Sequence, residues 1–384
     1  MKNLYYLLFI GISLQTYYFY GKGGPLISIF SLLLLGLILF DNKKTIVFPY
    51  HVSSKIFVWY FIILLWSILG VLIFQLNFDF NRFGGFIIVA ISSLISYRYF
   101  KVCSLKTTIK WYLFVNIIFF YIQFFGFYLF GFEIDYLVNI TGEKQRMFAG
   151  SFNFPYFNSF IRPTGLYQEP GTYATFLSPF IALFGRYSES KQNKKLYYSA
   201  ILSLFLSFST FGIIFGSIIL LLSKKVRPSL KVIIGCVVSL ISYPYIHYRF
   251  VLSKATDVDV GFGFRINQIT ETVNILKNNT QSWFFGTNLL SIVPKNVQLT
   301  GAYNDSSLLL YLILFLGPIL TITTIILIGR EFLKGDLFSK TGIIILFLSK
   351  ISIFMPFFPF IVNSLLWKNR EIPLKGERII EKRI

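Results

Sequence analysis

The stretch IFVWYFIILLWSILGVLIFQL, residues 56–76, contains no charged side chain. As a helix that rises ~1.5 Å per residue, it is long enough to cross the ~30 Å hydrocarbon core of a bilayer. Backbone polar groups must be hydrogen-bonded inside lipid, so unbroken apolar runs of this length favour helices over a barrel. Comparable runs occupy residues 4–20, 26–40, 83–100, 109–132, 167–185, 230–246 and 306–328. We therefore expect an all-α polytopic integral membrane protein, with residues 1–384 forming a single membrane domain.

The composition of the chain supports this fold class and argues against two others. The 384 residues are 55% hydrophobic and 20% aromatic, more apolar surface than a soluble domain of this size can bury. The net charge of +20 would suit a nucleic-acid partner, but the lysines and arginines gather at the ends of apolar runs, as the positive-inside rule describes. The two cysteines and two histidines show no spacing of a metal centre or disulfide framework. We expect no nucleic-acid partner and no cofactor.

The distribution of positive charge sets the expected topology. With the amino terminus in the cytoplasm, the basic turns 41–55 and 98–110 lie inside. The apolar stretches 196–223 and 341–367 are each about 27 residues long and lie between basic segments, so each should cross an even number of times or re-enter. We predict about 12 crossings, with a range of 10–12. Both termini, including the basic tail 368–384, should be cytoplasmic.

Each of these two stretches contains a signal for a turn. The first should turn near Ser207–Gly212, and Met355-Pro356 and Pro359 supply the break in the second. Lys350 lies within the second stretch. An ionisable residue in such a place marks function by default, but a lysine that extends to the membrane surface explains it equally well.

Two polar loops, residues 133–166 and 247–305, interrupt the apolar pattern and should both lie outside the cytoplasm. In the second loop, apolar residues recur at helical spacing between Phe262 and Lys277. We predict an amphipathic helix there, lying on the outer leaflet or capping a cavity. Arg265 should sit on the flank of its apolar face, where a guanidinium can reach a lipid phosphate or simply extend to the headgroups.

The first loop leads into the sequence RPTGLYQEPGTYA, residues 162–174. Glu169-Pro170 is typical of a helix amino terminus, because proline fits the first turn and the helix dipole favours a carboxylate there. The free backbone N–H groups of that turn would point to the outer surface close to Arg162, an arrangement that suits a diphosphate anion. A capping glutamate and an arginine at the membrane surface are the alternative interpretation.

These residues resemble a known family. The pattern Arg162-x-x-Gly165-x-x-x-Glu169-Pro170 resembles a segment shared by the Wzy-type polymerases of O-antigen and capsule repeat units and by the O-antigen ligases. The layout of many spans with two large outer loops is also similar. Later in the chain the resemblance continues in Gly261-x-Gly263-x-Arg265, in Phe285-Gly286 and in Tyr303-Asn304-Asp305-Ser306.

The resemblance implies that the protein polymerises undecaprenyl-diphosphate-linked oligosaccharide repeat units into surface polysaccharide, by inverting glycosyl transfer without a metal. The site would lie on the outer face of the bacterial cytoplasmic (inner) membrane. Arg162 and Arg265 would neutralise the diphosphate leaving group, and Glu169 is the candidate for any catalytic base, with Asp305 behind it. A chain-length regulator protein and a flippase would be its protein partners, alongside the lipid bilayer. The expected substrate-binding residues are Gly165, Tyr167, Tyr303, Asn304, Asp305 and Arg146.

Other interpretations fit parts of the same pattern. An O-antigen ligase would carry a histidine directly before Asn304, where this chain has Tyr303. A non-enzymatic flippase or transporter of lipid-linked oligosaccharide would show internal repeats and charged residues through several spans. The pair Asp257 and Asp259 imitates a metal-binding motif of nucleotide-sugar glycosyltransferases, although a solvated loop explains it better. Asp305 suits an ordinary helix cap equally well.

Overall fold

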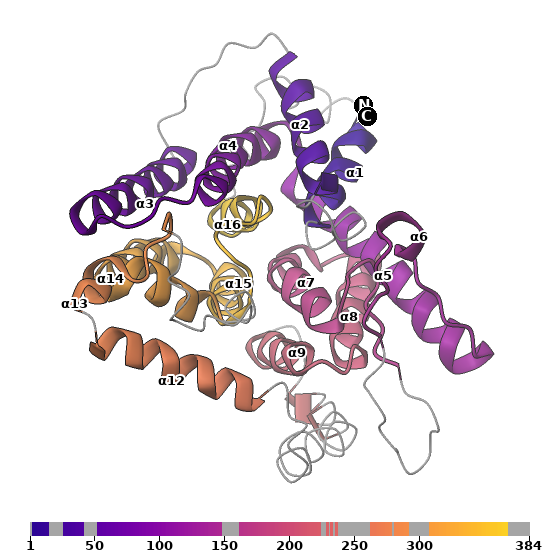
Figure 1. The fold of residues 1–384 in the computed structure, drawn as a ribbon. Helices are drawn as coiled ribbons and strands as arrows, with labels where there is room; N and C mark the ends of the chain where they lie inside the picture. The colour runs from indigo at the N-terminus through magenta and orange to yellow at the C-terminus, as the bar shows by residue number, and fades with distance from the viewer. Residues whose placement is uncertain are drawn as a thin grey trace.

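The computed structural model describes residues 2–14, 26–41, 52–147, 161–223, 228–229, 231–232, 235–236, 262–278, 280–291 and 307–367. Within these ranges the chain forms helices joined by turns and short extended segments (Figure 1), which confirms the expected all-helical fold. The helices are α1 (Lys2–Ser13), α2 (Leu26–Asp41), α3 (Val52–Phe74), α4 (Phe80–Val102), α5 (Leu105–Phe130), α6 (Val138–Thr141), α7 (Pro170–Phe184), the 3-10 helix η2 (Gly185–Tyr187), α8 (Lys191–Leu206), α9 (Thr210–Leu222), α12 (Phe262–Asn278), α13 (Thr280–Phe285), α14 (Leu308–Lys334), α15 (Leu337–Leu348) and α16 (Phe358–Leu366).

Among the described helices, four are long and apolar enough to cross a membrane: α3 (from Ile56 onward), α4, α5 and α14. Shorter apolar helices are α1, α2, α9 and α15. These helices agree with a membrane-embedded protein, whereas the number of crossings stays a prediction. Most of the apolar run 230–246 and all of the tail 368–384 lie outside the described residues.

The apolar stretch 196–223 forms two helices, α8 and α9, which pack against each other. They are separated at Ser207–Ser209, inside the predicted turn. Ser209 caps α9, because its hydroxyl accepts a hydrogen bond of 2.8 Å from the N–H of Gly212. A Cβ at Gly212 would lie only 2.3 Å from the carbonyl oxygen of Leu204, so the missing side chain lets the two helices approach. The predicted break between two short helices is confirmed.

The second predicted hairpin is likewise divided into two helices, α15 and α16, by residues 349–357. Asp336 before α15 and Trp367 after α16 line one pocket, so these helices run antiparallel. Pro359 lies in the first turn of α16, where its missing N–H leaves no helical hydrogen bond unmade. The predicted break is confirmed, but it is longer than a tight turn and it contains Lys350.

The centre of the bundle is an aromatic core around Phe9 of α1, whose side chain is fully buried. Its ring contacts aromatic rings from four other helices, with centroid separations of 5.5–5.8 Å. Helix α1 is therefore an integral part of the packed bundle. The four rings are Tyr99 of α4, Tyr112 of α5, Phe180 of α7 and Phe360 of α16.

Helices α7 and α15 pack side by side and antiparallel (Figure 1). At one end, the Arg186 guanidinium after α7 forms a two-bond pair with Asp336 before α15, with N–O distances of 2.6 and 2.7 Å. Burial alone would raise the pKa of Asp336, but the hydrogen bonds and charge of Arg186 outweigh it and hold that pKa below its usual value. At the other end Lys350 pairs with Glu169. Ion pairs therefore join the two helices at both ends.

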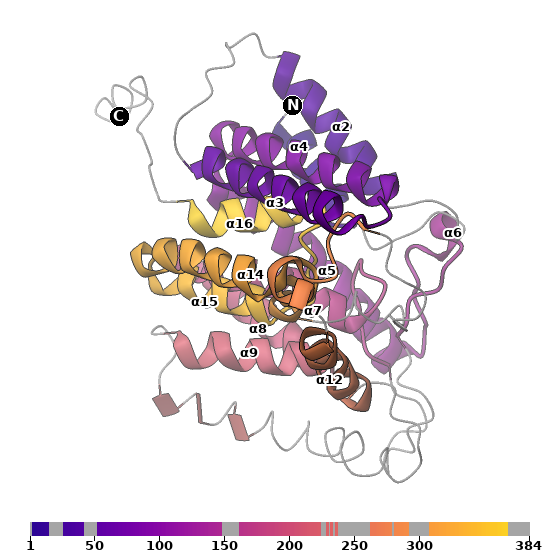
Figure 2. The same cartoon turned by 60° about the vertical axis from the view of Figure 1, so that its left-hand side comes forward.

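The second polar loop contributes α12, which lies toward the same end of the bundle as α6 of the first loop (Figure 2). The predicted amphipathic segment is confirmed as a helix. Ile269 and Val273 of its apolar face are exposed, with 52% and 41% of their surface accessible, while Thr272 is buried. An apolar face left uncovered by protein agrees with a position against lipid.

Pro318 bends α14 and creates a joint with the second loop. Because proline has no N–H, the carbonyl of Leu314 loses its usual partner within the helix. Thr287, just after α13, supplies the replacement: its N–H donates to that oxygen at 2.7 Å and its hydroxyl at 3.2 Å. Gly286 and Gly317 lie in the same contact, with positive φ values of 62° and 78°. The second loop thus docks where α14 is bent.

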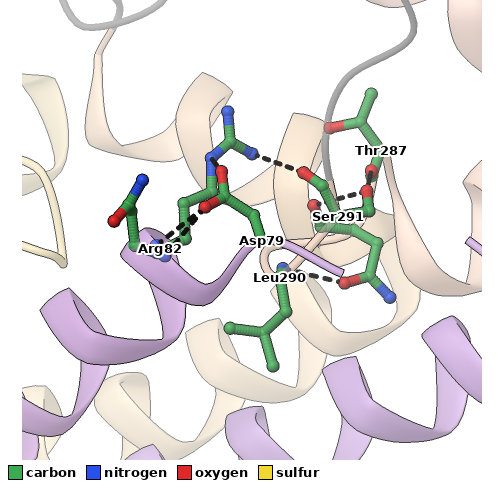
Figure 3. Close-up of polar contacts among 7 residues, drawn as sticks. Asp79, Arg82, Thr287, Leu290 and Ser291 are labelled. Atoms are coloured by element: carbon green, nitrogen blue, oxygen red, sulfur yellow. Dashed lines mark hydrogen bonds and ion pairs between the residues drawn. The ribbon is translucent and has the colours of Figure 1, made fainter. Parts of the chain in front are cut away.

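A polar contact with the turn between α3 and α4 fixes the same segment (Figure 3). The N–H of Asp79 donates to the carbonyl of Leu290 at 2.7 Å. Arg82 pairs with the Asp79 carboxylate at 3.4 Å and donates to the carbonyl of Ser291 at 3.0 Å. The predicted topology places this turn and the second loop on the same side of the membrane, and here the two are in contact.

Candidate functional site

Two buried glutamine amides hold the segment that follows Arg162. The Gln123 carboxamide oxygen, from α5, accepts hydrogen bonds from the N–H groups of Thr164 (3.0 Å) and Gly165 (2.9 Å). The Gln123 nitrogen donates to the side-chain oxygen of Gln145 at 2.8 Å. In turn, the Gln145 nitrogen donates to the carbonyls of Gly165 (2.9 Å) and Tyr167 (2.8 Å). A satisfied buried network of this kind makes the segment rigid.

Gly165 and Tyr167, both expected to bind substrate, make their contacts with the protein itself. Gly165 has a positive φ of 56°, and a Cβ there would lie 3.2 Å from the ring of Tyr173. The Tyr167 side chain is fully buried, and its hydroxyl is hydrogen-bonded to the hydroxyls of Tyr112 and Ser13. In this structure Gly165 allows the backbone of the loop to turn, and Tyr167 fixes the loop to helices α1 and α5.

Two arginines of the first loop lie on paired backbone segments. The N–H of Arg146 donates to the carbonyl of Gln168, and the N–H of Arg162 donates to the carbonyl of Met147, each at 2.7 Å. The Arg146 side chain is exposed. The Nε of Arg162 is buried and has no hydrogen-bond partner. A buried guanidinium N–H without a partner is unfavourable, so an anion at this position would satisfy an otherwise costly group.

Glu169 forms an ion pair with Lys350, the residue that the sequence left open between a functional and a membrane-surface role. The two side chains are 28% and 12% exposed. The Glu169 carboxylate also accepts a bond of 3.1 Å from the Thr172 hydroxyl, and the positive charge of Arg146 acts on it. The partners are 181 positions apart in the chain, so no local sequence pattern could have matched them.

The remaining predicted site residues are placed in part. Arg265 lies on α12, and its side chain is outside the described part of the chain. Asp257 and Asp259 of the weaker metal-binding interpretation are also outside the described residues. In the ranges that the structure does describe, no three His, Cys, Asp or Glu side chains group where a metal ion could be held. Outside the described residues too are Tyr303, Asn304 and Asp305.

The described site is therefore a rigid, positively charged surface at the amino end of α7. Lys350 and Arg146 act on the Glu169 carboxylate, and Arg162 is joined to the same loop through its backbone bond to Met147. A second carboxylate, Glu143, accepts a hydrogen bond of 2.7 Å from the Gln168 amide. Such a surface can bind a multiply charged anion. Comparisons of the chain with protein-family models, with curated proteins and with solved structures found no match.

The Glu169–Lys350 pair should contribute to stability as a coupled unit. Lys350→Met leaves a partly buried carboxylate without its partner, and we expect a loss of about 1–3 kcal/mol. Glu169→Gln together with Lys350→Met should cost less than the sum of the single variants. Thermal unfolding of the detergent-solubilised protein measures this. Lys334→Met, which breaks the surface pair with Glu331, is the matched control and should change stability by less than ~0.5 kcal/mol. Additive effects at Glu169 and Lys350 would show that the pair is not coupled.

Proposed function

We propose that the protein is a polymerase of lipid-linked oligosaccharide repeat units, acting on the outer face of the bacterial cytoplasmic membrane. The observation that carries the proposal is the unpartnered, buried Nε of Arg162 on a rigid loop at the start of α7. The family resemblance of residues 162–170 gives this anion-binding geometry a matching substrate, an undecaprenyl diphosphate. Localisation and orientation follow the positive-inside pattern of the sequence.

The proposed reaction joins an acceptor sugar hydroxyl to the anomeric carbon of the donor while the lipid diphosphate departs. Negative charge grows on the diphosphate oxygens as the bond to the sugar breaks. Positive groups already fixed in place stabilise that growing charge more than they stabilise the bound substrate. Arg162 and Arg146 are held by backbone hydrogen bonds, and Gln123 and Gln145 fix the segment between Arg162 and α7. The backbone of the site would need little rearrangement during the reaction, whereas the groups that cover the Arg162 Nε would have to move aside for the diphosphate.

The amino end of α7 would add to the anion site. Glu169 occupies the cap position, but its carboxylate accepts no bond from a backbone N–H of the first turn of α7, only one from the Thr172 hydroxyl. Its charge is directed to Lys350 instead. Backbone N–H groups of the first turn then stay available for an anion, which the helix dipole also favours.

The ion pair with Lys350 makes Glu169 a weaker base than an unpaired carboxylate, although the sequence made it the candidate for the catalytic base. A carboxylate already paired with an ammonium group holds its negative charge more firmly and takes up a proton less readily. In the proposed mechanism Glu169 therefore orients Lys350 and the start of α7. It accepts the proton of the acceptor hydroxyl only when bound substrate displaces Lys350.

The test is to delete the gene in its native host and separate the surface glycan by size. A polymerase is supported if the deletion strain carries only single repeat units on the lipid core and the wild-type gene restores long chains. Long chains that remain on their lipid carrier would instead identify a ligase. Loss of even the single-unit product would point to a transporter of the lipid-linked oligosaccharide.

Chelation of divalent metals should leave polymer formation unchanged, because the proposed charge stabilisation comes from arginines. The measurement is incorporation of labelled lipid-linked repeat unit into long chains by isolated membranes, with and without a chelator. Asp257→Ala/Asp259→Ala is the accompanying variant and should retain activity. Two results together would restore the metal-binding interpretation of this pair: a strict requirement of the wild type for added metal, and loss of polymer formation in the double variant.

A further inference from the structure

An apolar groove with a volume of about 800 Å³ lies between α5 and α8, which pack side by side (Figure 1). The two helices run parallel. Lys110 donates to the side chain of Gln192 at 3.2 Å, and the Tyr121 hydroxyl donates to the carbonyl of Ser199 at 3.1 Å. Large apolar side chains form most of the lining, among them Phe114, Ile118, Ile122, Phe125, Phe130 and Phe132.

Positive charge is concentrated where the two helices begin. A second pocket of about 530 Å³ continues the groove there and shares Lys110 and Gln192 with it. Lys106 lines this second pocket, and Lys195 lines the groove. Among the described residues that line either pocket, none is acidic. The combined site is apolar along its length and basic at one end.

We propose that this groove binds an anionic phospholipid, with the phosphate at the three lysines and an acyl chain against the apolar wall of α5. Basic pockets between membrane helices bind anionic headgroups, and a lysine ammonium serves as a point charge for phosphate. The basic end is where α5 and α8 start, which the positive-inside pattern assigns to the cytoplasmic side. The lipid would therefore belong to the cytoplasmic leaflet.

The groove is longer than a lipid of one leaflet needs, because its lining on α5 runs from Lys110 to Phe130, a rise of about 30 Å at ~1.5 Å per residue. An acyl chain would occupy the half of the groove nearer the lysines. From Lys110 to Tyr121, α5 rises about 17 Å at ~1.5 Å per residue. That length is about half of the ~30 Å hydrocarbon core, the depth that one acyl chain reaches. Exposed apolar side chains continue along this face, including Phe114 and Ile118, so the chain would lie against a surface already suited to hydrocarbon.

The basic end of this groove is separate from the site at the start of α7. Helix α7 runs from Glu169 at the proposed catalytic end to Arg186 at the other, and α8 begins directly after that second end. The lipid site therefore stands or fails independently of the proposed polymerase activity.

Native mass spectrometry of the detergent-solubilised protein tests the site. The probes are phosphatidylglycerol and phosphatidylcholine with identical acyl chains, so that only the headgroup charge differs. The wild type should retain phosphatidylglycerol in preference. Lys110→Gln/Lys195→Gln should weaken phosphatidylglycerol binding roughly tenfold or more and leave phosphatidylcholine binding unchanged. Ile118→Trp, which fills the groove without changing charge, should weaken binding of both lipids.

Lys191→Gln/Lys194→Gln is the matched control, because these two lysines are exposed at the start of α8 and line neither pocket. It should bind phosphatidylglycerol as the wild type does. An equal loss in this control would mean general attraction between basic residues and anionic lipid, and would overturn the site. Equal binding of the two lipids by the wild type would overturn it as well. Melting temperatures in the same detergent show that each variant is folded.

Discussion

Arg162→Ala should abolish long-chain glycan while the protein stays in the membrane at a normal level. Removing one fixed donor to a developing negative charge typically costs ~2.7–4 kcal/mol, or roughly 10²–10³ in rate. The buried Nε of Arg162 makes no hydrogen bond that the substitution would break. The loss should therefore appear in the reaction rather than in folding. Polymer length in the complemented deletion host, beside an immunoblot of the membrane fraction, measures both.

Two further variants make this result specific. Arg162→Lys keeps the charge but loses the planar fork that can bind two phosphate oxygens, and it should also fail to make polymer. Lys144→Ala removes a positive charge from an exposed position in the same loop and should make polymer normally. Arg265→Ala is expected to behave like Arg162→Ala. Near-normal polymer from both arginine-to-alanine variants would remove the proposed anion clamp.

Gly317→Ala should destabilise the protein by about 3 kcal/mol or more, because two separate costs add. Gly317 has φ 78° and ψ 160°, a conformation that is essentially restricted to glycine. A Cβ there would also lie 2.7 Å from the carbonyl oxygen of Phe284, and backbone cannot rotate away as a side chain can. The expected result is a large drop in the melting temperature of the solubilised protein, with loss of the docked second loop.

Gly329→Ala is the control for this prediction. It changes a glycine of the same helix, α14, where an added Cβ would meet nothing within 4 Å. Alanine favours a helix by roughly 0.5–1 kcal/mol over glycine, so this variant should be unchanged or slightly more stable. Equal melting temperatures for the two alanine variants would contradict the close backbone contact described here.

The sequence predicted the helices well where periodicity or apolar length carried the information. The hairpin break near Ser207, the break around Pro356 and the amphipathic helix from Phe262 all appear in the structure. The number of crossings could not be fixed in the same way. Stretches of about 13 residues are too short to span ~30 Å of hydrocarbon as straight helices, and composition alone does not distinguish a tilted helix from a re-entrant one.

The site was predictable only where its residues are close in the chain. Arg162 and Glu169 belong to one short motif, so their proximity followed from the sequence. The bond between Gln123 of α5 and Gln145 of the first loop, and the pairing of Lys350 with Glu169, depend on tertiary packing. An isolated glutamine in an apolar helix gives no indication of its partner, although a polar residue buried in such a helix is itself a signal that a partner exists.

The pairing of α7 with α15 has a consequence for the timing of biosynthesis. Glu169 leaves the ribosome 181 residues before Lys350, a delay of about 10–40 s at ~5–20 residues per second. During that interval the nascent chain carries the first polar loop and the start of α7, but neither of the ion pairs that join α7 to α15. The Glu169–Lys350 pair can thus form only after α15 and Lys350 have been synthesised. Translation arrested before Asp336 should yield a chain that inserts its early helices and has no activity.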